Sequence, residues 1–157
     1  MNMNRRDALC ISAGFLGFAG LGGRSMANGS EMVEVFKSPN CGCCMDWIRH
    51  LEEDGFIVSY RNVSLESLDA IRRRAGVPDA LQGCHTALIA GYVVEGHVPS
   101  RDIRRLLEGM PEARGLSVPG MPIGSPGMGP EDQREAYDVI LIAKDGTGSI
   151  FASYPVA

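Results

Sequence analysis

The chain has 157 residues and five cysteines, with 45% hydrophobic and 22% charged side chains. This length predicts one domain and is too short for two full cores. The formal charge of −4 and the pI near 5.3 argue against a nucleic-acid binder, and the longest apolar run is too short and glycine-rich to span a bilayer.

The first 27 residues have the layout of an export signal. Arg5 and Arg6 precede an apolar stretch from residue 8 to about 21, and small residues near Ala27 match a cleavage site. The arginine pair is typical of a twin-arginine signal. We therefore expect residues 1–27, with Cys10, to be removed and residues 28–157 to act in the periplasm without a stable membrane span. An uncleaved membrane anchor is the alternative.

The following residues alternate between strand and helix patterns. Strand patterns occupy residues 32–36, 56–60, 86–90 and 92–95, and amphipathic helices are expected near 44–54, 64–76 and 100–109. Ser64 and Ser100 are predicted to cap the second and third helices, and Arg72–Arg74 to form a solvated face. The order β-α-β-α-β-β-α, with a parallel pair and an antiparallel hairpin, predicts a thioredoxin-like α/β fold.

The last third of the chain is expected to begin with a long loop and to end with a hairpin. Residues 111–130 are dense in Gly and Pro and contain Met121 and Met128. Loops of this length are usually functional or disordered. Residues 137–143 and 150–154 then have strand patterns around Asp145-Gly146, which predicts a C-terminal β-hairpin that extends the sheet or covers its edge.

Three cysteines lie between the first strand and the first helix, as Cys41-Gly42-Cys43-Cys44. The helix dipole at this position favours thiolates. Cys41 and Cys44 form a C-x-x-C pair and are the candidate redox thiols. A disulfide oxidoreductase needs no Cys43, and Cys84 replaces the cis-proline usual opposite the dithiol in this fold. Four converging thiolates therefore indicate a soft metal site for Cu(I), zinc or an iron–sulfur cluster, with Cys41, Cys43, Cys44 and Cys84 as the candidate ligands.

Other interpretations of the four cysteines remain open. Two disulfides, Cys41–Cys44 and Cys43–Cys84, would suit an exported domain, although the second bridge is awkward beside the first. Zinc is an alternative ion, but adjacent Cys43 and Cys44 do not match the usual spacing of a zinc knuckle.

Two histidines, two methionines and one tryptophan are further candidates for a place in or near the site. His85 follows a candidate ligand, and because adjacent strand residues point to opposite faces, we expect it to be structural. His97 is not placed by the sequence. Met121 and Met128 are either hydrophobic plugs or soft ligands near the site, and Trp47 is expected in the core.

Four segments together resemble the CopG-like periplasmic copper-resistance proteins, a thioredoxin-like metal-binding family formerly described as a domain of unknown function. They are 38–44 (SPNCGCC), 83–87 (GCHTA), 91–99 (GYVVEGHVP) and 118–128 (VPGMPIGSPGM). The resemblance covers residues 32–154. It implies a thioredoxin-like fold, copper bound by Cys41, Cys43, Cys44 and Cys84, multinuclear copper clusters, and a redox role in handling Cu(I) and Cu(II).

The sequence therefore predicts a periplasmic protein of copper resistance that binds Cu(I) and has redox-active thiols. Whether the protein is an enzyme is left open. Its expected partners are copper ions and periplasmic copper-handling proteins, not nucleic acid. The alternative is a thiol–disulfide oxidoreductase that acts on exported proteins through Cys41 and Cys44. A metallochaperone that only passes copper onward is a third interpretation.

Overall fold

A computed structural model of the chain describes residues 32–157. The predicted export signal is residues 1–27, which include Cys10 and the expected cleavage site near Ala27. It lies outside the described residues. The helices are α1 (Gly42–Glu53), α2 (Leu65–Ala75) and α3 (Ser100–Gly109), with short 3-10 turns η1 (Asp79–Leu81) and η2 (Glu131–Gln133). The strands are β1 (Met32–Lys37), β2 (Ile57–Asn62), β3 (Thr86–Ile89), β4 (Tyr92–Glu95), β5 (Ala113–Ser117), β6 (Tyr137–Ala143) and β7 (Gly148–Tyr154).

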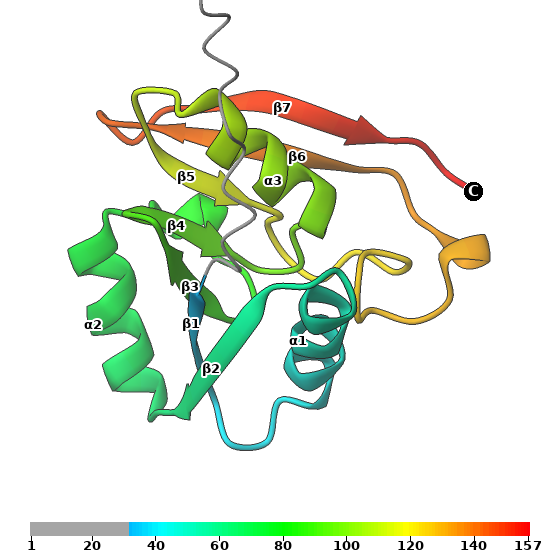
Figure 1. Ribbon diagram of the computed structural model, residues 1–157, viewed down its shortest axis with the longest axis horizontal. Helices are drawn as coiled ribbons and strands as arrows, with labels where there is room; N and C mark the ends of the chain where they lie inside the picture. The colour runs from blue at the N-terminus through cyan, green and yellow to red at the C-terminus, as the bar shows by residue number, and fades with distance from the viewer. Residues whose placement is uncertain (1–31) are drawn as a thin grey trace, which may run out of the picture.

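The seven strands of the described region form one sheet in the order β2-β1-β3-β4-β5-β6-β7 (Figure 1). β1 pairs with β2 in parallel and with β3 antiparallel, and β3 and β4 form an antiparallel hairpin. The predicted order β-α-β-α-β-β-α is thus observed from β1 to α3. The predicted C-terminal hairpin is also present, because β6 and β7 pair antiparallel and extend the sheet beyond β5.

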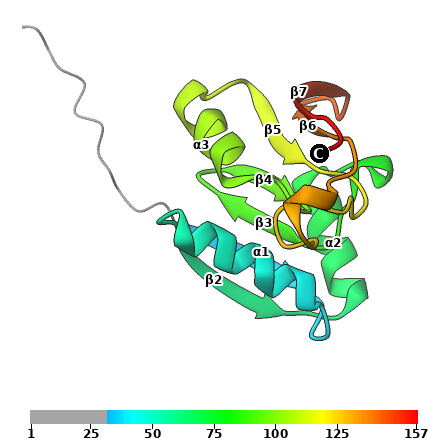
Figure 2. The same ribbon diagram turned by 90° about the vertical axis from the view of Figure 1, so that its right-hand side faces the viewer.

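The helices cover both faces of the sheet. α1 and α3 lie on one face and α2 on the other (Figures 1 and 2). The spacing of apolar residues in α1 buries Cys44, Trp47, Ile48 and Leu51, as an amphipathic helix requires. Trp47 joins the main core between this helix layer and the sheet, which confirms its expected place.

Two of the predicted helix caps were tested by the structure, with different outcomes. Ser64 caps α2 by accepting a hydrogen bond from the Ser67 amide at 3.2 Å, and Gly76 ends the helix in the left-handed conformation. Ser100 does not cap α3, because Pro99 occupies the cap position and no side chain accepts a capping bond there. Instead, the Ser100 amide donates to Nε2 of His50 on α1 at 3.2 Å, so α1 and α3 are joined at this end.

The prediction of a loop beginning at Pro111 was wrong for residues 113–117. These residues form β5, which pairs in parallel with β4 and antiparallel with β6. Ala113, Leu116 and Ser117 are buried by these pairings. The Gly/Pro-rich loop begins after β5 and runs to β6, interrupted by η2.

The expected solvated face at Arg72–Arg74 was also wrong for its first residue. Arg73 and Arg74 are exposed, but Arg72 is only 7% exposed. Its guanidinium forms an ion pair with the fully buried carboxylate of Glu95, with Nε and Oε1 2.9 Å apart. A buried carboxylate explains the position of this arginine, because an unpaired charge in the interior is costly.

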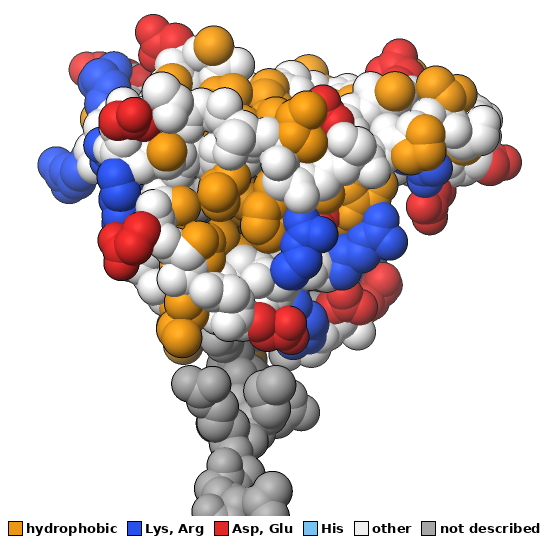
Figure 3. Space-filling model, turned by 90° about the horizontal axis from the view of Figure 1, so that it is seen from above, with side chains coloured by type: hydrophobic (Ala, Val, Ile, Leu, Met, Phe, Trp, Pro, Cys, Tyr) orange, Lys and Arg blue, Asp and Glu red, His pale blue; other side chains and the backbone are white. Residues whose placement is uncertain are grey.

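The surface view in Figure 3 shows positive and negative side chains interspersed around apolar patches. That face therefore lacks the continuous basic surface typical of nucleic-acid binders. None of the helices that the structure describes has the length and apolar character needed to cross a membrane.

All three histidines of the chain have their pKa lowered by burial. Each imidazole therefore binds a proton more weakly in the folded chain than in the unfolded chain, where its pKa is near 6.5. Folding gains from this difference above pH 6.5, and the gain is lost as the pH falls through the folded-state pKa values.

His50 provides a test of this pH dependence at the end of α1 remote from its cysteines. Because His50→Gln keeps a hydrogen-bond acceptor for the Ser100 amide but cannot be protonated, the variant should lose stability less steeply than the wild type between pH 7 and pH 5. Urea denaturation at several pH values measures the two slopes. Identical slopes would contradict the assignment of a lowered pKa to His50.

Candidate metal centre

The three clustered cysteines lie where β1 passes into α1. Cys41 is the N-cap residue of α1, and its amide donates to the carbonyl of Ser38 across the preceding turn. No side chain caps this helix end, and the first turn contains no acidic residue. The helix N-terminus therefore presents unpaired amides and the positive end of its dipole to the cysteine sulfurs.

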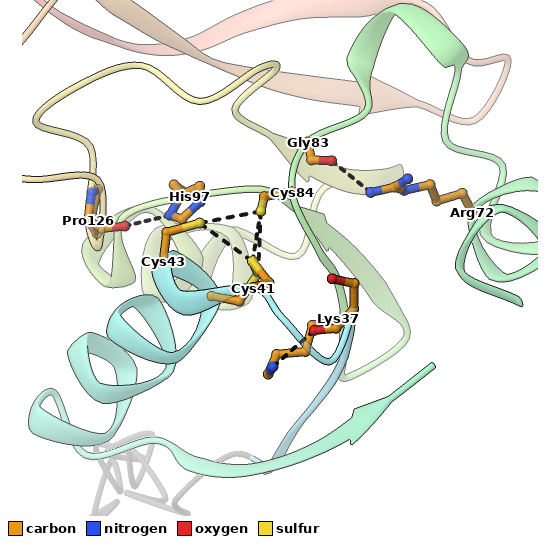
Figure 4. Close-up of a disulfide and its surroundings, with 10 residues drawn as sticks. Lys37, Cys41, Cys43, Arg72, Gly83, Cys84, His97 and Pro126 are labelled. Atoms are coloured by element: carbon orange, nitrogen blue, oxygen red, sulfur yellow. Dashed lines mark hydrogen bonds between the residues drawn. A yellow bond between two sulfur atoms is a disulfide. The ribbon is translucent and has the colours of Figure 1, made fainter. Parts of the chain in front are cut away.

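Cys84 reaches these sulfurs from the segment between η1 and β3. Its Sγ lies 2.9 Å from Sγ of Cys41 and 3.4 Å from the sulfurs of both Cys43 and Cys44. The Cys41 and Cys43 sulfurs are 3.5 Å apart. Figure 4 shows Cys41, Cys43 and Cys84 facing one another. The structure thus brings together the four cysteines that the sequence selected, and Cys84 joins the other three from a distant part of the chain.

The candidate redox pair is present as a disulfide between Cys41 and Cys44. Cys43 and Cys84 are free thiols, so the second bridge of the two-disulfide alternative is not formed. Burial raises the pKa of the Cys84 thiol to about 12, and the neighbouring Cys43 thiol adds to this rise. Cys84 is therefore protonated at neutral pH, and a metal ion that binds its thiolate must displace the proton.

Two histidines adjoin the sulfur cluster. His85 is fully buried against Trp47, with ring centroids 4.2 Å apart, and neither ring nitrogen has a hydrogen-bond partner. His97 uses Nδ1 to contact the Pro126 carbonyl at 2.7 Å, while its Nε2 has no partner. Buried polar atoms are normally satisfied, so these three nitrogens indicate a ligand or water.

The expectation that His85 points away from Cys84 was wrong. Donor atoms of Cys84, His85 and His97 lie within 4.8 Å of one another. The alternation of side chains does not apply here, because Cys84 and His85 precede the first residue of β3. Burial lowers the pKa of both imidazoles, so at neutral pH they are uncharged and can act as nitrogen ligands.

The Gly/Pro-rich loop packs over the first turn of α1. A Cβ atom on Gly127 would lie 2.7 Å from the Trp47 amide nitrogen and 2.8 Å from the Cys43 carbonyl, so only glycine allows this approach. Met121 in the same loop is 56% exposed, and Met128 is partly buried. Neither methionine belongs to the main core, so the role of a hydrophobic plug is not supported for either of them.

Two charged residues beside the site were missed at the sequence level. Glu95 ends a strand pattern of otherwise apolar and aromatic residues, and Arg72 lies on a helix with two further arginines. The signal for Glu95 was its acidic side chain within a short, otherwise buried strand. The Arg72 signal was weaker, since only its place on the apolar side of α2 distinguishes it from Arg73 and Arg74.

Comparisons with known proteins point to copper resistance. A family model described as "Protein of unknown function, DUF411" matches residues 81–128. The solved structure described as "Copper resistance protein copG- Form 1" is 45% identical, with a TM-score of 0.74, and the match covers 79% of this chain and 97% of that one. "Copper resistance protein copG- Form 2" is also 45% identical, with a TM-score of 0.73 and coverage of 80% and 98%. No curated protein matches the chain.

Proposed function

The chain belongs to the family of CopG copper resistance proteins, and from this premise we propose that it is an exported protein that holds Cu(I) in copper resistance. The observation that carries the proposal is the position of Cys84, whose sulfur lies within 3.4 Å of the three other cysteine sulfurs. Thiolates are soft ligands and select Cu(I). The proposed ligands are Cys41, Cys43, Cys44 and Cys84.

The site has enough potential ligand atoms for more than one copper ion. Besides the four sulfurs, His85 and His97 contribute three buried ring nitrogens without partners, close to Cys84. A thiolate can bridge two soft ions, so Cys84 is suited to join a sulfur-rich position to a mixed sulfur and nitrogen position. We therefore include a multinuclear site in the proposal.

The Cys41–Cys44 disulfide adds a redox function to the proposal. When two Cu(II) ions oxidise the Cys41 and Cys44 thiols, each ion gains one electron and becomes Cu(I). One S–S bond forms, and two protons leave. Because the disulfide removes two thiolates from the ligand set, a reductant must restore both thiols before all four sulfurs can bind copper again.

The proposed location and fold class agree with this function. We propose that residues 1–27 form a cleaved twin-arginine signal and that the remaining residues act in the periplasm. The strand order β2-β1-β3-β4 with α1 and α3 on one face supports a thioredoxin-like assignment for residues 32–109. β5, β6, β7 and the loop then form an extension whose backbone reaches Cys43.

Replacement of Cys43 tests the metal function directly. In anaerobic titrations of the reduced protein with Cu(I), we expect Cys43→Ser to bind less copper, or to bind it at least about tenfold more weakly, because a direct thiolate ligand is lost. Met110→Ser, which removes a sulfur that is 73% exposed at the end of α3, should titrate like the wild type. Unchanged stoichiometry and affinity in Cys43→Ser would refute the four-sulfur site.

A second candidate function is favoured by the disulfide at the start of α1. A thiol–disulfide oxidoreductase would use Cys41 and Cys44 on exported proteins and would not need Cys43 or Cys84. An insulin-reduction assay separates the two functions. Full exchange activity in Cys43→Ser and Cys84→Ser, together with no copper binding by the wild type, would establish the oxidoreductase.

A further inference from the structure

A buried ion pair contacts the residue that precedes Cys84 in the chain. Glu95 at the end of β4 is completely buried, Arg72 of α2 is almost so, and Nε of Arg72 lies 2.9 Å from Oε1 of Glu95. Buried ion pairs often add no stability over apolar residues of similar size, because both charges lose their hydration. Stability alone therefore does not explain the pair.

Both charged residues bind the backbone of Gly83, the residue before Cys84. The Gly83 amide donates to Oε1 of Glu95 at 2.9 Å. Nη2 of Arg72 donates to the Gly83 carbonyl at 2.7 Å, the contact drawn in Figure 4. The other carboxylate oxygen of Glu95 accepts from the hydroxyl of Thr86 at 2.7 Å. The pair thus holds the chain on both sides of Cys84.

The segment at Gly83 has little other means of being held. A Cβ on residue 83 would lie 2.6 Å from the Cα of Gly96 and 3.2 Å from the carbonyl oxygen of Val118, so no side chain fits there to anchor it by packing. Residues 82–85 also lie outside the strands. Only the two ends of this segment accept backbone hydrogen bonds from elsewhere in the described chain: the Gln82 carbonyl accepts from the Gly120 amide, and the His85 carbonyl accepts from the Gly96 amide. Directional, charge-assisted hydrogen bonds are suited to fixing such a segment.

We propose that Arg72 and Glu95 are positioning residues of the copper site, which hold the Gly83 peptide groups so that the Cys84 sulfur faces the three cysteines of α1. This inference rests on the proposed function for the identity of the metal. The geometry itself concerns the metal-free chain, in which Cys84 already lies 2.9 to 3.4 Å from the other sulfurs. Neither residue is a ligand, and both act through Cys84.

The test compares Arg72→Met/Glu95→Gln with the wild type and with the control Arg73→Met. The double variant removes both charges together and keeps the side-chain volumes, so neither partner is left buried and unpaired. Arg73 is the adjacent, exposed arginine of the same helix. Arg72→Lys is a third variant, because lysine keeps the charge but cannot bind the Glu95 carboxylate and the Gly83 carbonyl as a fork.

The first measurement is Cu(I) affinity by chelator competition, with thiol alkylation of the copper-loaded protein mapped by mass spectrometry. We expect the double variant to bind copper about 10- to 100-fold more weakly and to expose Cys84, and not the cysteines of α1, to alkylation. Arg72→Lys should recover part of the affinity, and Arg73→Met should match the wild type. If Cys84 stays protected and the affinity stays within twofold of the control, the pair is only structural and the proposal is overturned.

The second measurement needs no copper and separates this inference from the proposed function. Diamide takes two electrons and two protons from each pair of thiols that it joins. In the reduced, metal-free wild type, excess diamide should form the Cys41–Cys44 disulfide and then join Cys84 to Cys43, whose sulfurs lie 3.4 Å apart. In the double variant we expect the Cys41–Cys44 disulfide alone, with Cys84 left as a free thiol. If Cys84 enters a disulfide in both the wild type and the double variant, or in neither of them, the positioning role is overturned. A wild type that shows this pattern but binds no Cu(I) would refute the proposed function alone.

Discussion

Cys84→Ser is expected to cause a larger loss of copper binding than any other single cysteine replacement. The Cys84 sulfur lies within 3.4 Å of the three other sulfurs, and it is also the only cysteine grouped with His85 and His97 among the described residues. Its loss therefore removes a ligand from both groups of donors at once. We expect the affinity for the first Cu(I) to fall at least about 100-fold and further ions not to bind.

The experiment is an anaerobic Cu(I) titration of the reduced protein, followed by the ultraviolet absorption of copper–thiolate bonds. Cys43→Ser is the matched comparison, because Cys43 is also a free, half-buried thiol but is not grouped with the histidines. Thermal unfolding of the metal-free proteins should be similar for the two variants. If Cys84→Ser binds copper as well as Cys43→Ser does, Cys84 does not link the two donor groups.

Trp47→Ala is expected to cause the largest loss of stability among single replacements near the site. Trp47 is completely buried in the main core, its ring lies 4.2 Å from that of His85, and its Nε1 donates to the Val98 carbonyl at 2.8 Å. The loop also packs on its backbone at Gly127. Removal of so large a buried side chain should lower the free energy of unfolding by about 3–5 kcal/mol.

Trp47→Phe separates the hydrogen bond from the packing. The phenyl ring keeps most of the buried apolar area but leaves the Val98 carbonyl without its donor, which costs about 1–3 kcal/mol. Urea denaturation of the reduced, metal-free proteins, followed by circular dichroism because the chain has only one tryptophan, measures both effects. A loss below about 1 kcal/mol for Trp47→Ala would show that the core closes around the missing ring.

The sequence predicted those parts of the fold whose signals are local. Ser64 and Gly76 mark the ends of α2, and the spacing from Cys44 to Leu51 defines the buried face of α1. β5 was missed because Gly115, whose strand propensity is low, lies at its centre. This strand forms because β4 and β6 supply partners on both sides, which no local pattern reports.

In the candidate site, too, the features with a local sequence signal were predicted, and those that depend on distant residues were not. The Cys-Gly-Cys-Cys turn lies within one short segment, and its role as a ligand cluster could be proposed from residue spacing and the position of the helix alone. The orientation of His85 could not, because it depends on the irregular backbone before β3. Arg72 resembled its exposed neighbours in residue type, and its pairing with the buried carboxylate of Glu95, 23 residues further along the chain, could not be predicted from local spacing.

Because the sulfurs are far apart along the chain, a copper ion bound as proposed would be a cross-link as well as a cargo. Cys84 is 41 residues from Cys43, so an ion held by both closes a loop that contains α1, β2 and α2. If the ion constrained the unfolded chain as a covalent bridge does, closing such a loop would remove entropy worth roughly 4 kcal/mol from that state. A bound copper ion should therefore raise the free energy of unfolding, and loss of the ion should lower it again.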